Sequence, residues 1–487
     1  MDTESDTPLY KRLARHIAQA IDAGTLRPGD RLPSVRHLSK QHQVSLTTAL
    51  QTYRHLENRS LIEARPKSGY FVKNARHVFA PPHTAPMADP GGGGMSQTIF
   101  EVMHLARTSC KIRLDIATGP PEVYPTRKLQ QLIAAVSRRQ PGILTNYPTG
   151  TGHAEFKAQI ARRMLDTGCH VHPEEIVITS GSTESLNLAL RAVTQPGDTV
   201  AVESPTYFGI LQILETLGLR ALEIPTNAIT GISVEALDLA TGTPGAVQAA
   251  VLMPNFHNPL GSLMPDESKA RVVRMLSERG IALIEDDVYG DLHYAERRPV
   301  AAKSFDTSGN VILCNSVTKT LAPGLRLGWI VPGRWHAHTE MLKLTSSIVT
   351  PELAQAAIAE FMQNGNYDHH LRKFRSGVRK QTAQMLAAVR KYFPADTEVR
   401  LPQGGYLLWI GLSAGVRSRQ VFDLARQQSI GIAPGLIFSN SGRFERYIRL
   451  NCGYPWNTAI EDSVRTIGDI VRRCSVSAGR LDAAGRE

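Results

Sequence analysis

The first 75 residues alternate between apolar stripes and short polar turns. One stripe repeats every four residues, at Leu9, Leu13, Ile17 and Ile21. This spacing places the apolar side chains on one face of a helix. A polar turn at 27–30 precedes a second predicted helix over 34–41, and Ser45 is placed to cap a third. The runs 61–64 and 70–72 then predict a hairpin, so the pattern favours a winged helix-turn-helix over 1–74.

A different pattern begins near residue 110. Short aliphatic runs alternate there with helical segments, and these runs are 175–179, 199–203, 250–253, 281–284 and 311–313. Such runs are typical of buried parallel strands in an α/β domain. We therefore predict a large α/β domain over 110–475 with a smaller α+β carboxyl-terminal lobe, followed by a tail over 476–487.

The segment between these two patterns, 75–109, is dominated by Pro, Gly, His and Ala. It includes Pro81-Pro82 and the glycine run 91–94. No strand precedes this glycine run and no Lys-Ser/Thr pair follows it, so it does not have the form of a phosphate-binding loop. The composition predicts a flexible linker.

Composition and charge narrow the classes of protein further. Apolar residues make up 42% of the chain, and no apolar run or amino-terminal signal core is long enough to predict a membrane segment. We expect a cytoplasmic protein. The five cysteines are scattered, which predicts reduced thiols and no metal site. The net charge is +11, and residues 1–76 hold thirteen Lys and Arg against seven Asp and Glu, whereas the rest of the chain holds 42 against 37. The basic excess lies in the head and favours a nucleic-acid partner there.

The third predicted helix has the residues that a DNA-reading helix needs. Short polar side chains occupy its amino-terminal turn, at Ser45, Thr47 and Thr48. Such side chains reach base edges, and nearby cations bind phosphates. The candidate cations are Arg31, Arg36, Arg54, Arg65 and Lys67, of which the last two belong to the predicted hairpin.

Three motifs in the head carry a resemblance to a known family. They are G-D-R-L-P-S-V-R-H-L at 29–38, V-S-L-T-T at 44–48 and P-K-S-G-Y-F-V at 66–72. The head resembles a GntR-type winged helix-turn-helix, which implies binding to double-stranded operator DNA and adds Ser34 and Gly69 to the candidate contacts. Members of that family commonly have arginine where this chain has Leu46, so their base preference at that position is not transferred.

The large domain contains, in one order along the chain, the groups that pyridoxal 5'-phosphate (PLP) chemistry requires. Gly181, Ser182 and Thr183 lie where a strand turns into a helix, so their amides can bind a phosphate. Tyr207 is a candidate partner for stacking on the pyridine ring, and Asn258 is a candidate donor to the ring hydroxyl. Each of these residues alone has an ordinary explanation as part of a turn or the core.

The remaining requirements are an acid, a lysine and a second phosphate contact. Asp286 ends an apolar strand and is a candidate partner for the pyridine nitrogen, with Tyr289 three residues later. Ser316 precedes Lys319 by three residues, and Arg326 follows the lysine by seven. A Schiff base needs an unprotonated lysine, and burial with neighbouring cations lowers a lysine pKa. Ser316 and Arg326 would complete the phosphate site.

Residues 115–470 resemble a class I/II aminotransferase domain of PLP fold type I. The resemblance implies that Lys319 carries the cofactor, Asp286 pairs with the ring nitrogen, Asn258 and Tyr289 contact the ring hydroxyl and Tyr207 stacks on the ring. It further implies that Arg449 binds a substrate carboxylate, that Gly119 lies near the substrate and that Tyr147 reaches the phosphate of a neighbouring subunit. A homodimer follows from that last role.

The order of head, linker and body resembles the MocR subfamily of transcription regulators. This resemblance implies a PLP-binding DNA-binding regulator that senses an amino acid, an amine or PLP itself. Two alternatives stay open: a working aminotransferase that carries a DNA-binding head, and a dimerisation scaffold without cofactor. The scaffold would be expected to have lost Lys319 or Asp286, and both are present.

Overall fold

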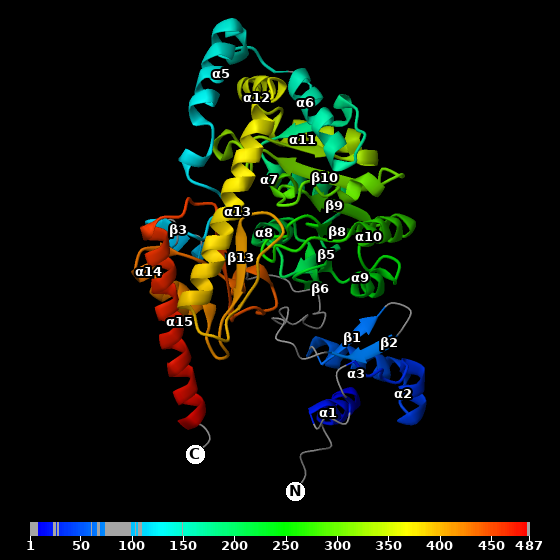
Figure 1. The fold of residues 1–487 in the computed structure, drawn as a ribbon. Helices are drawn as coiled ribbons and strands as arrows, with labels where there is room; N and C mark the ends of the chain where they lie inside the picture. Colours follow the sequence, from blue (N-terminus) through cyan, green and yellow to red (C-terminus); the bar gives the residue numbers. More distant parts are fainter. Residues whose placement is uncertain are drawn as a thin grey trace. The chain divides into compact units, whose positions relative to one another are not determined.

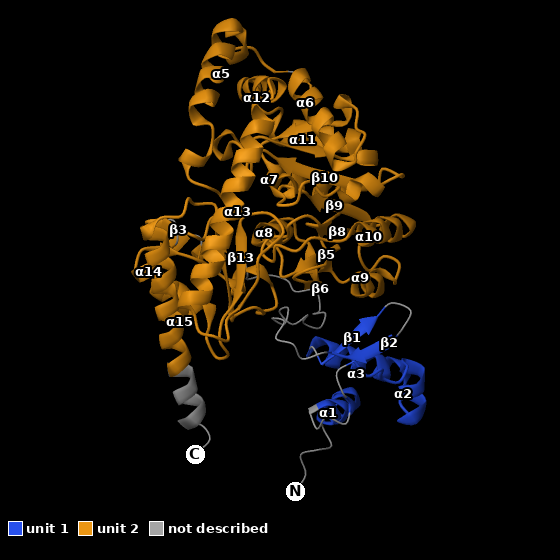
Figure 2. Ribbon diagram, in the orientation of Figure 1, with its two compact units in different colours: residues 1–85 blue, residues 86–487 orange. Residues whose placement is uncertain are grey.

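The computed structural model separates into two compact units, residues 1–85 and 86–487 (Figures 1 and 2). The residues that it describes are 8–22, 26, 29–59, 61–65, 69–73, 99–102, 104–105, 110–148 and 150–484. The side chains of residue 22 and of 477–484 are not among them.

The first unit has three helices and a hairpin, as predicted. Its elements are α1 (Leu9–Asp22), α2 (Val35–Gln41), α3 (Leu46–Asn58), β1 (Ile62–Arg65) and β2 (Gly69–Val72). The strands are antiparallel, and Arg65 pairs with Gly69 next to the turn. Ala14, Leu38 and Tyr53 are buried in a small core. The Tyr53 hydroxyl donates to the carbonyl oxygen of Pro33 at 2.6 Å, which joins α3 to the segment before α2.

An eight-stranded sheet forms the centre of the second unit. Its strands, from one edge to the other, are β4 (Val177–Thr179), β11 (Gly328–Val331), β10 (Val311–Ser316), β9 (Ala282–Asp286), β8 (Ala249–Leu252), β5 (Thr199–Ser204), β6 (Arg220–Asn227) and β7 (Gly231–Ile232). The central pairs from β10 to β6 are parallel, whereas β11 and β7 run antiparallel to their neighbours. The run at 175–179, predicted as one of the parallel strands, forms β4, which runs in the same direction as β10 but pairs with the antiparallel β11 between them.

Helices cover both faces of this sheet (Figure 1). Val200 and Val202 of β5 pack with α7 and α8, whereas Ala201 between them packs with α9 and α10, as the alternation of a strand requires. The helices of this unit are α5 (Thr126–Arg139), α6 (Ala154–Met164), α7 (Ser182–Val193), α8 (Phe208–Thr216), α9 (Val234–Thr241), α10 (Asp266–Glu278), α11 (His336–Ser347), α12 (Glu352–Gln363), α13 (Asn366–Tyr392), α14 (Ser418–Gln427) and α15 (Thr458–Ala484). Short 3-10 segments are Pro121–Val123, Pro141–Leu144, Leu165–Thr167, Pro173–Glu175, Gly290–Leu292, Ala302–Phe305, Pro323–Leu325, Gly333–Trp335 and Gly435–Phe438.

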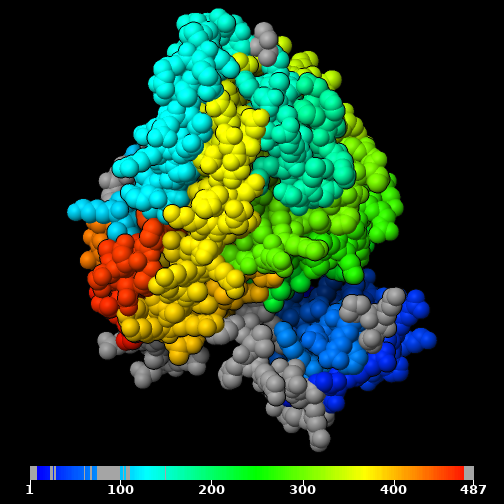
Figure 3. Space-filling model, turned by 45° about the horizontal axis from the view of Figure 1, so that its top comes forward, coloured from blue at the N-terminus to red at the C-terminus, as the bar shows by residue number. Residues whose placement is uncertain are grey.

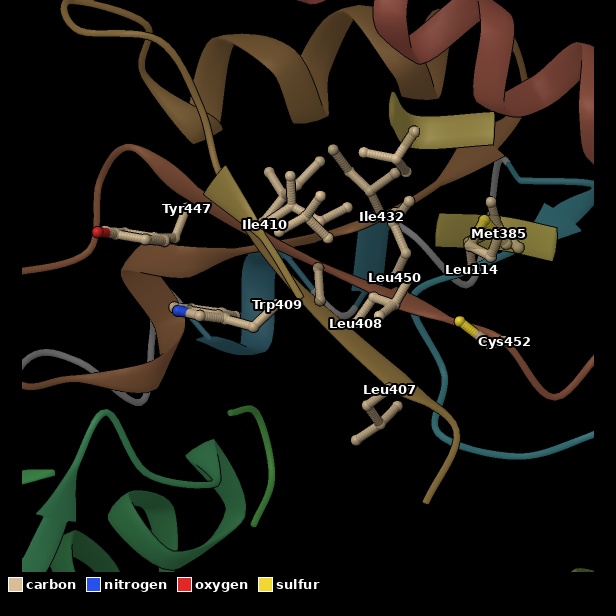
Figure 4. Close-up of a cluster of buried hydrophobic side chains, with 14 of the residues drawn as sticks. Leu114, Met385, Leu407, Leu408, Trp409, Ile410, Ile432, Tyr447, Leu450 and Cys452 are labelled. Carbon is tan, nitrogen blue, oxygen red and sulfur yellow. The ribbon is translucent and has the colours of Figure 1, made fainter. Parts of the chain in front are cut away.

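The carboxyl-terminal lobe has its own sheet and core. Four antiparallel strands lie in the order β12 (Glu398–Val399), β13 (Leu407–Gly411), β16 (Tyr447–Asn451) and β15 (Ala433–Pro434). Figure 4 shows the buried side chains of β13 and β16, where the rings of Trp409 and Tyr447 stack at 5.3 Å. A separate parallel pair joins β3 (Ile112–Arg113) to β14 (Ile430–Gly431), which attaches the start of the domain to this lobe.

Two predicted boundaries need correction. Residues 99–102 are helical, and Ile99 and Val102 are buried in the core of the carboxyl-terminal lobe. The predicted flexible linker over 75–109 therefore extends too far toward the body, because these two apolar side chains have a core to enter. At the other end, α15 continues to Ala484, so most of the predicted tail over 476–487 belongs to a helix.

Among the described residues, no helix is long and apolar enough to cross a membrane. No group of three or more His, Cys, Asp or Glu side chains in the same part of the chain could hold a metal ion.

Candidate cofactor site and DNA-binding surface

The candidate cofactor residues lie at the carboxyl ends of strands of the large sheet. Asp286 ends β9, and Lys319 follows the end of β10 by three residues. Gly181 follows β4, Tyr207 follows β5 and Asn258 follows β8. In open α/β sheets ligands bind at this edge, where the loops meet. The topology therefore brings together residues that are up to 138 positions apart in the chain.

The amine of Lys319 is held by a backbone oxygen. Its Nζ donates to the carbonyl oxygen of Ala117 at 3.0 Å. Burial lowers the pKa of Lys319 to about 8, with further lowering by the positive charges of Arg449 and Arg326, whereas the carboxylate of Asp286 acts in the opposite direction. An amine with this pKa is available as a nucleophile near neutral pH.

Asp286 and Tyr289 are buried with polar atoms that have no partner. Within the described residues, Asp286 Oδ1 and the Tyr289 hydroxyl accept or donate no hydrogen bond. Burial raises the pKa of Asp286 to about 7, against the positive charge of Lys319. Burial also raises the pKa of Tyr289. Buried polar groups are normally satisfied, so these two atoms indicate a missing polar ligand.

Arg449 lies on β16 and is almost completely buried. One terminal nitrogen donates to Asn258 Oδ1 at 2.9 Å, the other donates to the carbonyl oxygen of Asp115, and Nε has no partner among the described residues. Burial lowers the pKa of Arg449. One hydrogen bond thus links Asn258, which was predicted to contact the cofactor, to Arg449, which was predicted to bind a carboxylate.

The predicted phosphate site is the turn before α7. Gly181 has a φ of +91°, and a Cβ there would lie 2.6 Å from a terminal nitrogen of Arg326, so the turn requires glycine. Arg326 donates to the carbonyl oxygen of Ser180 at 3.3 Å and to the hydroxyl of Thr318 at 3.4 Å. Thr183 and Arg326 line an open cavity of about 450 Å³. Ser182 begins α7 beside them.

The other predicted residues have different surroundings. Tyr207 lies at the start of α8, and burial raises its pKa. The hydroxyl of Ser316 accepts the backbone N–H of Thr318 at 3.4 Å. At Gly119 a Cβ would lie 2.6 Å from the side chain of Val123, so the close packing of this loop requires glycine. Tyr147 is 71% exposed.

Two helices of the first unit, α2 and α3, are each capped by a serine that was predicted to contact DNA. Ser45 Oγ accepts the backbone N–H of Thr48 at 3.0 Å and bonds the Thr48 hydroxyl at 2.8 Å. Ser34 caps α2 in the same way, through the N–H of His37. These hydroxyls therefore set the helix starts, whereas Thr47 is exposed and carries no such bond among the described residues.

The predicted cations of the head differ in their exposure and in their partners. Arg36 is exposed on α2, and Arg54 is half-buried on α3. The guanidinium of Arg31 lies 3.6 Å from the position of a Cβ at Gly69, beside the hairpin turn. Arg65 pairs with Glu63 at 2.7 Å and stacks on the ring of Phe71. Lys67 lies outside the described residues.

Comparisons with known proteins identify both units. Residues 121–457 match the aminotransferase class I and II family, and residues 9–72 match the bacterial regulatory proteins of the gntR family. The HTH-type transcriptional regulator YjiR of Escherichia coli (strain K12) is 38% identical over 95% of this chain and 99% of that protein. YdcR of the same strain is 34% identical over 95% of this chain and 99% of that protein. The chain belongs to the MocR-type regulators.

The aminotransferase-like body of this MocR-type regulator also resembles solved structures. LysN, the alpha-aminoadipate aminotransferase of Thermus thermophilus, matches with a TM-score of 0.72 and 26% identity. The match covers 78% of this chain and 95% of LysN, which was crystallised with N-(5'-phosphopyridoxyl)-L-leucine. The predicted fold class is confirmed for both units of the MocR-type chain.

Several residues near Lys319 escaped the sequence analysis. The buried hydroxyl of Tyr406 donates to the carbonyl oxygen of Ala117 at 3.0 Å, the oxygen that also accepts from Lys319. Tyr124 accepts the N–H of Gly119 at 3.0 Å and bonds the hydroxyl of Thr118 at 3.1 Å. Ala117 contributes only its backbone carbonyl oxygen, so its residue type gives no indication of this role. Tyr406 lies 87 residues beyond Lys319, and only the meeting of the two lobes brings them together.

The raised pKa of Asp286 gives a testable pH dependence. We expect Asp286→Asn to stabilise the MocR-type body of the cofactor-free protein. The folded wild type keeps a proton up to about pH 7 that the unfolded chain releases near pH 4, so this group makes the folded state less stable as the pH rises between these values. The gain in melting temperature should therefore grow from pH 4 to pH 7 and then level off. The exposed Asp166→Asn is the control, and a pH-independent gain would contradict the assignment.

Proposed function

We propose that this chain is a PLP-binding transcription regulator of the cytoplasm whose aminotransferase-like body senses an amino acid, an amine or PLP itself. The observation that carries the proposal is the buried group formed by Lys319, Asp286, Tyr289 and Arg449, with unpaired polar atoms on the last three. Its presence in a chain with a DNA-binding head favours a ligand-controlled regulator.

The residues of the body fit the cofactor. Lys319 supplies a nucleophilic amine, and Asp286 supplies a carboxyl oxygen without a partner for a ring nitrogen. The Tyr289 hydroxyl is free for a ring oxygen. The turn at Gly181 with Arg326 supplies amides and a cation for a phosphate. When bound, the cofactor supplies an aldehyde carbon and an electron-withdrawing ring.

Arg449 supports an effector that carries a carboxylate. Its guanidinium is buried, and its free Nε offers a charge-assisted hydrogen bond. We expect Arg449→Ala to weaken the response to an α-amino acid by at least about tenfold, because a hydrogen bond between charged groups contributes about 1.5–3 kcal/mol. PLP loading should be unchanged. The measurement is operator binding titrated with the amino acid, and an unaltered response would remove Arg449 from the ligand site.

The active form in this proposal is a homodimer. Tyr147 is exposed in a single chain, although the family resemblance assigns it to the phosphate site of a neighbouring subunit. A second subunit would supply that tyrosine to the phosphate site, and two chains would present two DNA-binding heads. An effector then changes operator binding only if it binds two arrangements of the dimer with different affinity.

The competing proposal is an active aminotransferase. The presence of Lys319, Asp286 and Arg449 supports it, because these groups can serve catalysis as well as sensing. Adding amino acids to the PLP-loaded protein separates the two. A shifted absorption band without keto acid supports a sensor, and accumulation of keto acid supports an enzyme.

DNA binding is tested on the exposed cations of the head. We expect Arg36→Ala to weaken operator binding and to reduce the slope of log K against log salt by about 1, as for one lost phosphate contact. Gel-shift or anisotropy titrations of operator fragments from about 50 to 200 mM salt measure the slope. Arg372→Ala, on the exposed side of α13, is the matched control. Equal slopes for the two variants would exclude Arg36 from the DNA contact.

A further inference from the structure

A second cavity lies beside α13. Its volume is about 400 Å³, within the range of small-molecule sites. One wall is the segment 122–128, and the other is a face of α13 between Asn366 and Gln381. Figure 3 shows the surface where the segment around residue 130 (cyan) borders α13 (yellow). None of the residues predicted to bind cofactor or substrate lines it.

The lining combines an apolar floor with a rim of net positive charge. Phe361, Phe374 and Val378 are buried and apolar, whereas the exposed rim holds Lys128, Lys373 and one acid, Glu122. Neither lysine forms an ion pair in the described part of the chain. This arrangement fits a molecule with an apolar body and a carboxylate, because the rings can cover the body while the ammonium groups bind the charge.

Two features of α13 leave room and a polar contact for such a molecule. Gly377 lies inside a helix of 27 residues, where glycine costs about 1 kcal/mol relative to alanine. A Cβ at this position would find only Gln381 Nε2 within 4 Å, at 3.8 Å, so packing does not require the glycine. Gln381 Oε1 is a buried acceptor that receives no hydrogen bond from any described residue. A ligand in the cavity would have space at Gly377, and Gln381 would meet its carboxylate through the amide NH2, because Oε1 and a carboxylate are both acceptors.

The α13 wall of this cavity contacts the backbone around Lys319. His370 bonds the carbonyl oxygen of Thr320, the residue after Lys319, at 2.7 Å. The ring of Phe374 packs edge-on against Tyr406 at 6.4 Å, and Tyr406 donates to the oxygen that accepts from Lys319. A ligand that moves α13 therefore acts on the surroundings of the lysine.

We propose that the cavity between residues 122–128 and α13 is a second ligand site, which takes a small amphipathic carboxylate and is coupled to the site of Lys319. Coupling of this kind is reciprocal, so cofactor loading also changes the affinity of the second site. Binding in the cavity is independent of the proposed function, whereas its effect on the lysine site rests on that function.

The probe is 4-fluorophenylacetate, followed by ¹⁹F NMR line broadening with the full chain, with and without PLP. We expect saturable binding that persists in Arg449→Ala, which removes the other carboxylate contact. Gly377→Leu should abolish binding by filling the cavity, and it should fold because leucine is a better helix former than glycine. Lys373→Ala should weaken binding about two- to fivefold, as expected for one lost ion pair of an exposed lysine, whereas Lys380→Ala on the same helix should not.

Three outcomes would overturn the proposal: no binding by the wild type at millimolar probe, loss of binding in Arg449→Ala, or unchanged binding in Gly377→Leu. If Gly377→Leu is unstable, the probe affinities of Lys373→Ala and Lys380→Ala test the proposal by themselves. Both lysines are exposed, so neither substitution should affect folding. The visible band of the PLP-loaded protein reports the coupling, which we expect as a shift at saturating probe. Probe binding without any PLP band would contradict the proposed function and leave the second site standing.

Discussion

Replacing Lys319 with alanine is expected to remove the visible absorption band of the PLP-loaded protein completely. The band requires covalent attachment, and attachment requires an unprotonated amine. With a pKa of about 8, roughly a quarter of the Lys319 amine is unprotonated at pH 7.5, against about one in a thousand for an ordinary lysine. Absorbance spectra of the two proteins after PLP loading and desalting make the measurement.

Lys319→Arg is the matched variant for this test, because it keeps a positive charge beside Asp286 but cannot form the covalent link. It should lose the band as Lys319→Ala does. Borohydride reduction of the loaded wild type, followed by peptide mass analysis, should place the cofactor on the peptide that contains Lys319. A band that survives in both variants, or a label on another lysine, would show that Lys319 does not carry the cofactor.

The sequence was sufficient for the main features because they follow from local patterns. The capping serines at 34 and 45, the hairpin with Gly69 and the order of strands and turns around Asp286 and Lys319 are all short-range signals. Each places a side chain at the end of an element. The parallel topology then brings those ends together without further information.

The features that were missed depend on contacts between distant segments. The strand β11 has the ordinary composition Gly-Trp-Ile-Val, and its antiparallel direction follows from the short return after Lys319. Ile99 and Val102 are buried in the core of a lobe that begins hundreds of residues later. The Gly- and Pro-rich composition around them gives no indication of this burial. The pairing of Arg65 with Glu63 depends on the rotamers of two exposed side chains.

A buried ion network supports the strand end that presents Asp286. Asp287, the next residue, is fully buried and contacts the guanidinium of Arg298. Arg298 also donates from Nε to Asp291 at 2.7 Å. Burial raises the pKa of Asp291, but Arg298 and Arg163 outweigh it and hold that pKa below its usual value. Arg298 is thus the cation shared by two carboxylates.

We expect Arg298→Met to lower the free energy of unfolding of the body by about 3–5 kcal/mol, because it leaves the buried Asp287 without its cation. Asn255 still donates to Asp287 at 2.9 Å but does not neutralise it. All four tryptophans lie in residues 86–487, so urea unfolding followed by tryptophan fluorescence reports on this unit alone. The neighbouring Arg297→Met is the control, since Arg297 is exposed.

The double variant Arg298→Met with Asp287→Asn separates lost charge pairing from lost packing. If the cost of Arg298→Met comes from an unpaired buried carboxylate, neutralising that carboxylate should restore part of the stability. Restoration would also allow Asp286 to keep its position, so the double variant should retain the PLP band. A loss no larger than that of Arg297→Met would mean that solvent reaches Asp287, and the network would then have no part in holding the strand end at the cofactor site.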